Sequence, residues 1–174
     1  MGVTETYIYW SRLEYKNWML HLAATDNGLC CITLPNDALD TFDQWMTKHT
    51  PHGRLVHDEP RLARYGRQLM EYFAGTRREF TFPLDLRGTP FQIAVWRALL
   101  QIPYGETRSY SEIATTIGRV AAVRAVGAAN GANPIPLVIP CHRVIGKNGT
   151  LTGYRGGLDV KAELLRLEGV QPAV

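Results

Sequence analysis

Apolar and polar positions in the first half of the chain follow the pattern of strands and then of one helix. Residues 18–25 are apolar and rich in strand-forming types, and residues 29–34 repeat that pattern after Asn27-Gly28. Both of these turn residues tolerate positive φ, so the dipeptide predicts a hairpin. A short strand is expected at 55–57. From Pro60 to Gly75 the spacing predicts an amphipathic helix, with an apolar stripe of Leu62, Tyr65, Leu69, Tyr72 and Phe73.

The second half predicts short helices. Thr89-Pro90 begins one that ends before Pro103, and its apolar stripe is Phe91, Val95, Ala98, Leu99 and Ile102. Ser109 with Glu112 three residues later forms a capping box for a second helix, which Gly118 ends. A third helix is expected over 121–129. Two short helices around a glycine turn indicate a helix-turn-helix, although many helical hairpins bind nothing.

The helix expected at 121–129 has two different faces. Val123, Val126 and Asn130 would point inward, whereas the opposite face carries small residues and one long side chain, Arg124. Small residues let a helix backbone approach closely, so this face suits a narrow groove with a cation reaching into it. Close packing against another helix is the alternative.

These elements predict an α+β chain with two domains. Residues 1–84 would form a support domain, an antiparallel sheet with a helix, and residues 85–174 a mostly helical domain with the helix-turn-helix. The hydrophobic fraction of 45% excludes the disordered class. The longest apolar run, 134–141, is far below the ~20 residues of a membrane helix. No secretory leader is recognised at the N-terminus, so we expect a cytoplasmic protein without a membrane partner.

The net charge of +3 conceals an asymmetry. Residues 1–80 carry 9 basic and 10 acidic side chains, whereas residues 81–174 carry 10 and 6. Within 107–157, six basic residues stand against Glu112 alone. This local excess predicts an anionic partner; a solvated face without a partner is the alternative.

Two of the three cysteines, Cys30 and Cys31, are adjacent on an expected strand. An odd number of cysteines makes a poor disulfide framework and suits a reducing compartment. Free cysteine is a frequent core residue, so both are expected to pack in the core. The histidines of this half have no metal-like spacing with either cysteine. We therefore expect neither a metal nor another cofactor.

The third cysteine has a different setting. A proline-bracketed apolar segment, 134–140, is expected as a strand that delivers Cys141-His142-Arg143. Nearby positive charge or a base lowers the pKa of a thiol from about 8.5 toward neutrality, and the thiolate is the nucleophile. Successive strand residues point to opposite faces. Cys141 and His142 can therefore meet only where the chain turns or through a water. A buried structural cysteine is the alternative.

The last helix supplies a carboxylate. Asp159 is expected to cap it, and Val160, Leu164 and Leu167 form its stripe. Glu168 lies beside that stripe in the last turn, where the helix dipole disfavours an anion. Orienting and charging a histidine, as in Cys–His–acid arrangements, would explain this position. A partly exposed terminal glutamate is the alternative.

Four stretches of the second half strongly resemble the O6-alkylguanine-DNA alkyltransferase family, the methylated-DNA–protein-cysteine S-methyltransferases. They are 104–110, 124–127, 133–146 and 152–157, and Pro-Cys-His-Arg with the upstream Asn133-Pro134 is highly specific. The first half matches more loosely. The resemblance implies DNA repair by direct reversal. O6-alkylguanine would be flipped out of double-stranded DNA through the minor groove, and its alkyl group would pass irreversibly to Cys141. O4-methylthymine stays open as a second substrate.

The resemblance also implies individual roles. Cys141 would accept the alkyl group, His142 would take its proton through a water, Glu168 would hold His142, and Asn133 would brace the turn before the cysteine.

The implied DNA contacts come from other elements. Tyr110 would contact the guanine and help rotate its phosphate, Arg124 would fill the gap left by the flipped base, and Tyr154 would belong to a lid. The main chain near Val144 would accept from the guanine amino group. Weaker candidates for phosphate contacts are Ser111, Arg119 and Lys147. The protein would act as a monomer that could cluster on DNA.

Three other functions compete with this one. A non-catalytic sensor of alkylated DNA would lack the acceptor cysteine, which is present here. A thiol-dependent hydrolase or redox enzyme would turn over and would leave the Arg124 face unexplained. A DNA-binding regulator with a structural cysteine would leave Glu168 unexplained.

Overall fold

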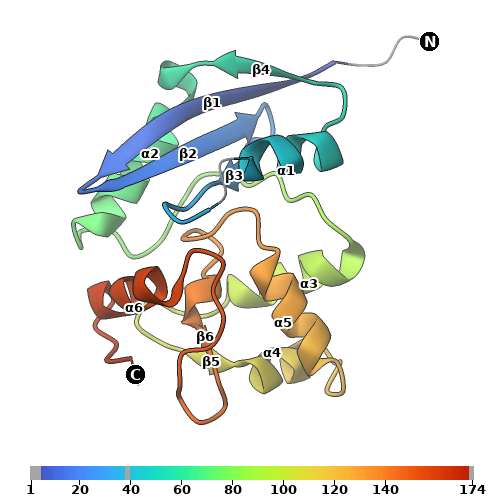
Figure 1. Cartoon of the computed structure of the whole chain (residues 1–174), viewed down its shortest axis with the longest axis vertical. Helices are drawn as coiled ribbons and strands as arrows, with labels where there is room; N and C mark the ends of the chain where they lie inside the picture. Colours follow the sequence, from blue (N-terminus) through green and yellow to red (C-terminus); the bar gives the residue numbers. More distant parts are fainter. Residues whose placement is uncertain (1–4, 38–39, 173–174) are drawn as a thin grey trace. The chain divides into compact units, whose positions relative to one another are not determined.

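The computed structural model describes residues 5–37 and 40–172. The chain divides into two compact units, Met1–Arg87 and Gly88–Val174, each with its own elements (Figure 1). In the residues that the structure describes, the first unit holds a four-stranded sheet with two helices, and the second is mostly helical. The α+β class and the helical second half are therefore confirmed. No helix among the described residues is both long and apolar enough to cross a membrane.

The sheet of the first unit has the strand order β3-β2-β1-β4. Its strands are β1 (Thr6–Tyr15), β2 (Trp18–Thr25), β3 (Gly28–Ile32) and β4 (Gly53–His57). The β2–β3 hairpin is confirmed, and β1–β2 is a second antiparallel pair. β4, however, joins β1 in parallel, so the sheet is mixed. At the predicted turn Gly28 takes a φ of 148°, and a Cβ there would lie 2.5 Å from the Pro83 carbonyl oxygen.

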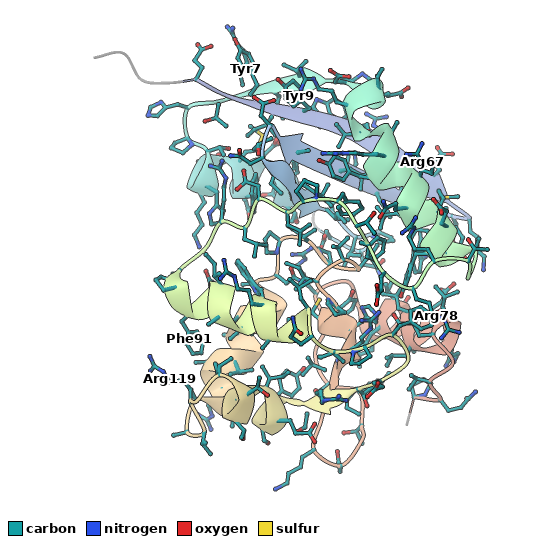
Figure 2. The ribbon with its side chains drawn as sticks, turned by 180° about the vertical axis from the view of Figure 1, so that it is seen from behind. Tyr7, Tyr9, Arg67, Arg78, Phe91 and Arg119 are labelled. Carbon is teal, nitrogen blue, oxygen red and sulfur yellow. The ribbon has the colours of Figure 1, made fainter. Side chains whose placement is uncertain are left out.

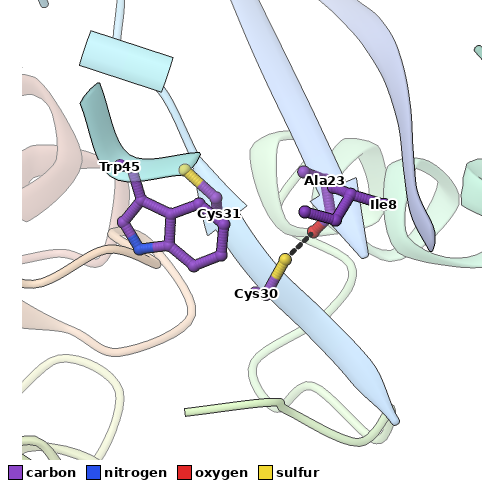
Figure 3. Packing of buried hydrophobic residues seen from close by; sticks show 5 residues of the cluster. All are labelled: Ile8, Ala23, Cys30, Cys31 and Trp45. Carbon is purple, nitrogen blue, oxygen red and sulfur yellow. Dashed lines mark hydrogen bonds between the residues drawn. The ribbon is translucent and has the colours of Figure 1, made fainter. Parts of the chain in front are cut away.

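The helices of the first unit are α1 (Thr41–His49) and α2 (Glu59–Phe73). The Asp58 side chain caps α2 by accepting a hydrogen bond from the Arg61 amide, and the predicted apolar stripe of α2 is buried. A core cluster joins the sheet to α1 and contains both cysteines of this unit: Ile8, Ala23, Cys30, Cys31 and Trp45. Figure 3 shows the Cys30 thiol donating to the Ala23 carbonyl, over 3.4 Å. The core assignment of Cys30 and Cys31 is confirmed.

Three helices of the second unit begin or end near their predicted limits. They are α3 (Pro90–Leu99), α4 (Tyr110–Thr116) and α5 (Val123–Gly131). Thr89 with Gln92, and Ser109 with Glu112, form complete capping boxes at α3 and α4. The indole of Trp96 on α3 donates to the Ala129 carbonyl on α5, over 2.8 Å, which links two helices that pack together. At the first turn of α3, Phe91 is only half-buried (Figure 2).

The remaining elements of this unit surround the third cysteine. They are the 3₁₀ turn η1 (Cys141–Arg143), β6 (Val144–Ile145), which pairs in parallel with β5 (Arg108–Ser109), and α6 (Leu158–Leu167). The expectation that Asp159 caps the last helix is wrong. Gly157 holds the N-cap position with a φ of 94°, and Asp159 lies inside the first turn.

Candidate active site

The segment before Cys141 is a buried turn, and the strand expected at 134–140 is absent from it. Asn133 organises this turn from within. Its Nδ2 donates to the Ile139 carbonyl over 2.8 Å, and its Oδ1 accepts from the Ile135 amide over 2.9 Å. One side-chain amide thus satisfies two main-chain groups that a strand ladder would otherwise pair. Leu137 takes a φ of 77°, which breaks any extended path.

The chain also turns at the cysteine itself, because Cys141–Arg143 is a 3₁₀ turn. The Asn130 side chain, from α5, donates to the Cys141 carbonyl over 3.5 Å. Cys141 is 4% exposed and His142 is fully buried. The chain therefore turns where Cys141 and His142 need a turn for their side chains to approach one another.

Glu168, the C-cap residue of α6, receives four hydrogen bonds in the interior. Oε2 accepts from His142 Nε2 at 2.6 Å and from Arg143 Nη2 at 3.1 Å. Oε1 accepts from Arg143 Nε at 2.8 Å and from the Gly105 amide at 3.1 Å. The alternative of an exposed terminal glutamate is therefore wrong. Two basic side chains and one amide explain why an anion stands at a helix C-terminus.

The charges of this network follow from burial and pairing. Burial alone would raise the pKa of Glu168, but His142 and Arg143 together hold it well below its usual range. Burial lowers the pKa of His142, and Glu168 opposes that shift only in part. The pair is thus a carboxylate and a neutral imidazole whose Nε2 carries the proton. His142 Nδ1 is then a buried acceptor, with no hydrogen-bond partner among residues 5–37 and 40–172.

The thiol of Cys141 is held protonated. Burial raises its pKa, and Asn133, Arg155, Lys161 and Tyr154 oppose this shift without reversing it. The expectation that neighbouring cations lower the pKa of this thiol toward neutrality is wrong, because desolvation of the thiolate outweighs their effect. Reaction at this sulfur therefore requires a base, and the nearest residue in sequence, His142, has a free acceptor nitrogen.

The segment 146–157 carries Tyr154 and is fastened to the site at several points. Arg155 donates to the Asn133 carbonyl over 2.8 Å. The Lys161 ammonium, from α6, donates to the Thr152 carbonyl over 2.8 Å. The Thr152 hydroxyl donates to the Tyr110 hydroxyl over 3.3 Å, which connects this segment to the start of α4. Three residues that the sequence left without a role, Arg155, Lys161 and Thr152, thus join the site residues.

Arg124 and the other proposed DNA contacts come from several elements of the second unit. Arg124 is exposed on α5 beside the small residues Ala121, Ala125 and Ala128, while Val126 and Asn130 face inward. Arg119 lies between α4 and α5 and is exposed (Figure 2). Lys147 is exposed, Ser111 is half-buried in the first turn of α4, and Val144 is buried in β6.

The basic excess of residues 107–157 is smaller at the surface than the sequence suggested. Arg143 is buried against Glu168, and Arg108 pairs with Glu106 at 3.2 Å. The guanidinium of Arg155 donates a hydrogen bond to the Asn133 carbonyl. The exposed cations without an ion pair in the described part of this stretch are Arg119, Arg124 and Lys147. Within the same described ranges, no group of three or more His, Cys, Asp or Glu side chains could hold a metal ion.

Sequence reasoning missed Lys161 and the partnership of Arg143 with Glu168. A signal for the first was present in the spacing of α6. Lys161, Leu164, Leu165 and Glu168 stand at i, i+3, i+4 and i+7, so two ionisable residues share one face with two leucines. All four are buried.

Comparison with known proteins places both halves of the chain in one family. Residues 8–86 match the model of "6-O-methylguanine DNA methyltransferase, ribonuclease-like domain", and residues 90–170 match that of its "DNA binding domain". An inducible methylated-DNA–protein-cysteine methyltransferase of Bacillus subtilis is 48% identical over 168 residues, covering 97% of this chain and 94% of that protein. A methylated-DNA–protein-cysteine methyltransferase of Methanosarcina acetivorans is 56% identical over 164 residues, covering 93% of this chain and 99% of that protein.

Solved structures agree with these matches. The crystal structure of Mycobacterium tuberculosis O6-methylguanine methyltransferase superimposes with a TM-score of 0.80 at 43% identity, covering 96% of each chain. A structure of the M. tuberculosis protein in complex with DNA gives 0.79 at 43% identity, covering 92% of this chain and 93% of the other.

Proposed function

The chain belongs to the 6-O-methylguanine DNA methyltransferase family, and from this premise we propose that it repairs O6-alkylguanine in double-stranded DNA by moving the alkyl group to Cys141. The observation that carries the proposal is the buried arrangement of Cys141, His142 and Glu168. It combines a protonated thiol, an imidazole with one free acceptor and a carboxylate that fixes the tautomer.

The reaction follows from this arrangement. His142 Nδ1 takes the thiol proton through a bridging water, and Glu168 stabilises the imidazolium that forms. The Cys141 sulfur then forms a bond to the alkyl carbon as the carbon–O6 bond breaks. The electron pair of the carbon–O6 bond leaves with the guanine, which takes up one proton. In the net reaction, the thiol proton moves to the guanine and the alkyl group moves to the Cys141 sulfur. A thioether is stable to the groups available here, so each molecule reacts once.

The target carbon lies inside the base stack and must be brought out, at a cost of a few kcal/mol. Arg124 is suited to offset part of this cost, because it extends from a helix face of small residues that can approach a groove closely. The Tyr110 hydroxyl is suited to stabilise charge that develops on the leaving base. Asn133 braces the turn, and the main chain near Val144 offers acceptors for the guanine amino group. Ser111, Arg119 and Lys147 would contact phosphates.

The experiment that tests this function is a mass measurement. The protein is incubated with a duplex that contains O6-methylguanine, and its intact mass and peptides are then determined. We expect one methyl group, on the Cys141 peptide, with a yield that never exceeds one per molecule. The Cys141→Ser variant is the control and should stay unmodified. Methyl release with recovery of the free thiol would support the thiol hydrolase instead. A parallel duplex with O4-methylthymine decides whether that base is a second substrate.

A further inference from the structure

Lys161 is a lysine in an unusual place. It lies on α6 and is fully buried, although lysine is almost never buried without a partner of opposite charge. Within the described ranges no carboxylate lies within ion-pair distance of its ammonium. Burial accordingly lowers the pKa of Lys161 to about 8, and the charge of Cys141 acts in the opposite direction. A buried cation of this kind calls for an anion that forms during function.

The position of the ammonium is fixed by two contacts from one segment. Nζ donates to the Thr152 carbonyl over 2.8 Å and lies 6.0 Å from the centre of the Tyr154 ring. Both partners are neutral, so they orient the ammonium without cancelling its charge. A cation held in this way next to a buried thiol acts at low dielectric, where its field is stronger than in water.

The groups that face the thiol come from four parts of the unit. Lys161 comes from α6, Arg155 and Tyr154 from the segment 146–157, Asn133 from the turn after α5, and His142 follows in η1. Arg155 already donates to the Asn133 carbonyl. Arg143, the other buried cation, is paired with Glu168. Lys161 is therefore the buried cation of the described site that has no acidic partner before the thiolate forms.

We propose that Lys161 is a positioning residue whose ammonium stabilises the Cys141 thiolate, so that sulfur becomes nucleophilic inside a dry site. The inference rests on the proposed function, but its main test does not need DNA. The proton lost by the thiol goes to His142, and Lys161 keeps its own proton. The positive charge then has the counter-anion that the resting site lacks. After alkylation the sulfur is a neutral thioether, and the ammonium again has no anion beside it.

The test compares Lys161→Met, which keeps the length of the side chain and removes its charge, with Arg166→Met. Arg166 is exposed on the same helix, so its loss removes an equal charge from the surface. The thiolate of Cys141 is titrated by absorbance at 240 nm from pH 7 to 10, after subtraction of the same variant carrying Cys141→Ala. The variants are compared at the lowest pH at which the wild type shows the signal, because Lys161, with a pKa of about 8, loses its own charge at higher pH. We expect Lys161→Met to lower the thiolate signal at least about fivefold, and Arg166→Met to leave it unchanged. Equal thiolate in wild type and Lys161→Met overturns the proposal.

A second measurement separates this role from a structural one. If Lys161 only anchors the segment 146–157, Lys161→Met should speed trypsin cleavage after Arg155 and lower the melting temperature, with the thiolate signal intact. We expect instead that the melting temperature holds or rises, because a buried unpaired charge is removed, while reaction with free O6-benzylguanine slows at least about tenfold. Failure of transfer in the wild type would refute the proposed function, yet the thiolate titration would still decide the role of Lys161.

Discussion

Glu168→Gln removes the negative charge at the centre of the buried network and leaves its shape almost unchanged. The carboxylate accepts four hydrogen bonds, three of them from His142 and Arg143. A glutamine offers one oxygen and turns an NH2 group toward donors. In either orientation of the amide, Arg143 would lose one of its two bonds to this side chain and keep the other, together with its bond to the Ile102 carbonyl. Breaking a buried pair from one side costs about 3–5 kcal/mol, so we expect a loss of unfolding free energy of that size.

The same change should slow alkyl transfer more than it affects DNA binding. Glu168 supports the basicity of His142 against burial, and general base catalysis contributes about 10²–10⁴-fold. We therefore expect a single-turnover rate at least about 10²-fold lower on an O6-methylguanine duplex, measured in conditions where the variant is fully folded. DNA affinity, measured by fluorescence anisotropy, should be nearly intact. Glu71→Gln, which breaks a partly exposed pair with Arg77, is the control. A wild-type rate in Glu168→Gln would place the carboxylate outside the proton path.

Two further predictions concern DNA and pH. Arg124→Ala should slow repair of duplex far more than reaction with free O6-benzylguanine, because only the duplex requires a base to leave the stack; Arg97→Ala, exposed on α3, is the control, and equal losses on both substrates would argue against a role in flipping. The acid limb of the transfer rate should lie below pH 6.5, because burial lowers the pKa of His142 and the imidazole accepts a proton only above that pKa. Rates with free O6-benzylguanine from pH 5 to 8 test this, and a midpoint above pH 7 would contradict it.

Local signals in the sequence identified much of the second unit. The helix start at Thr89-Pro90, the capping box of Ser109 with Glu112 and the glycine after α4 depend on close neighbours in sequence, so they could be recognised without knowledge of the fold. The same holds for the stripe of α2. β1 was missed because its buried positions do not alternate: only Ile8 and Ser11 are buried along ten residues. The parallel pairing of β4 depends on a distant strand and leaves no local signal.

The site shows the same division. Cys141, His142 and Glu168 stood out because each contradicted its local surroundings. The turn at 134–140 was mistaken for a strand because the two side-chain bonds of Asn133, which replace a ladder, are invisible in an apolar run. The pKa direction of Cys141 was wrong because cationic neighbours can be counted in a sequence, whereas desolvation requires knowing that the sulfur is buried.

The short parallel ladder between β5 and β6 fixes how the start of α4 lies relative to the turn at Cys141. It pairs Arg108 with Val144 and Ser109 with Ile145, so the residue before Tyr110 is held opposite a residue four positions after Cys141. Displacement at carbon tolerates reacting atoms only about 3–3.5 Å apart, and one residue of strand spans about 3.3 Å. A one-residue slip in this ladder would therefore shift Tyr110, relative to Cys141, by about the separation that such a displacement allows. Two residue pairs thus fix the spacing between the residue before Tyr110 and the turn that carries Cys141.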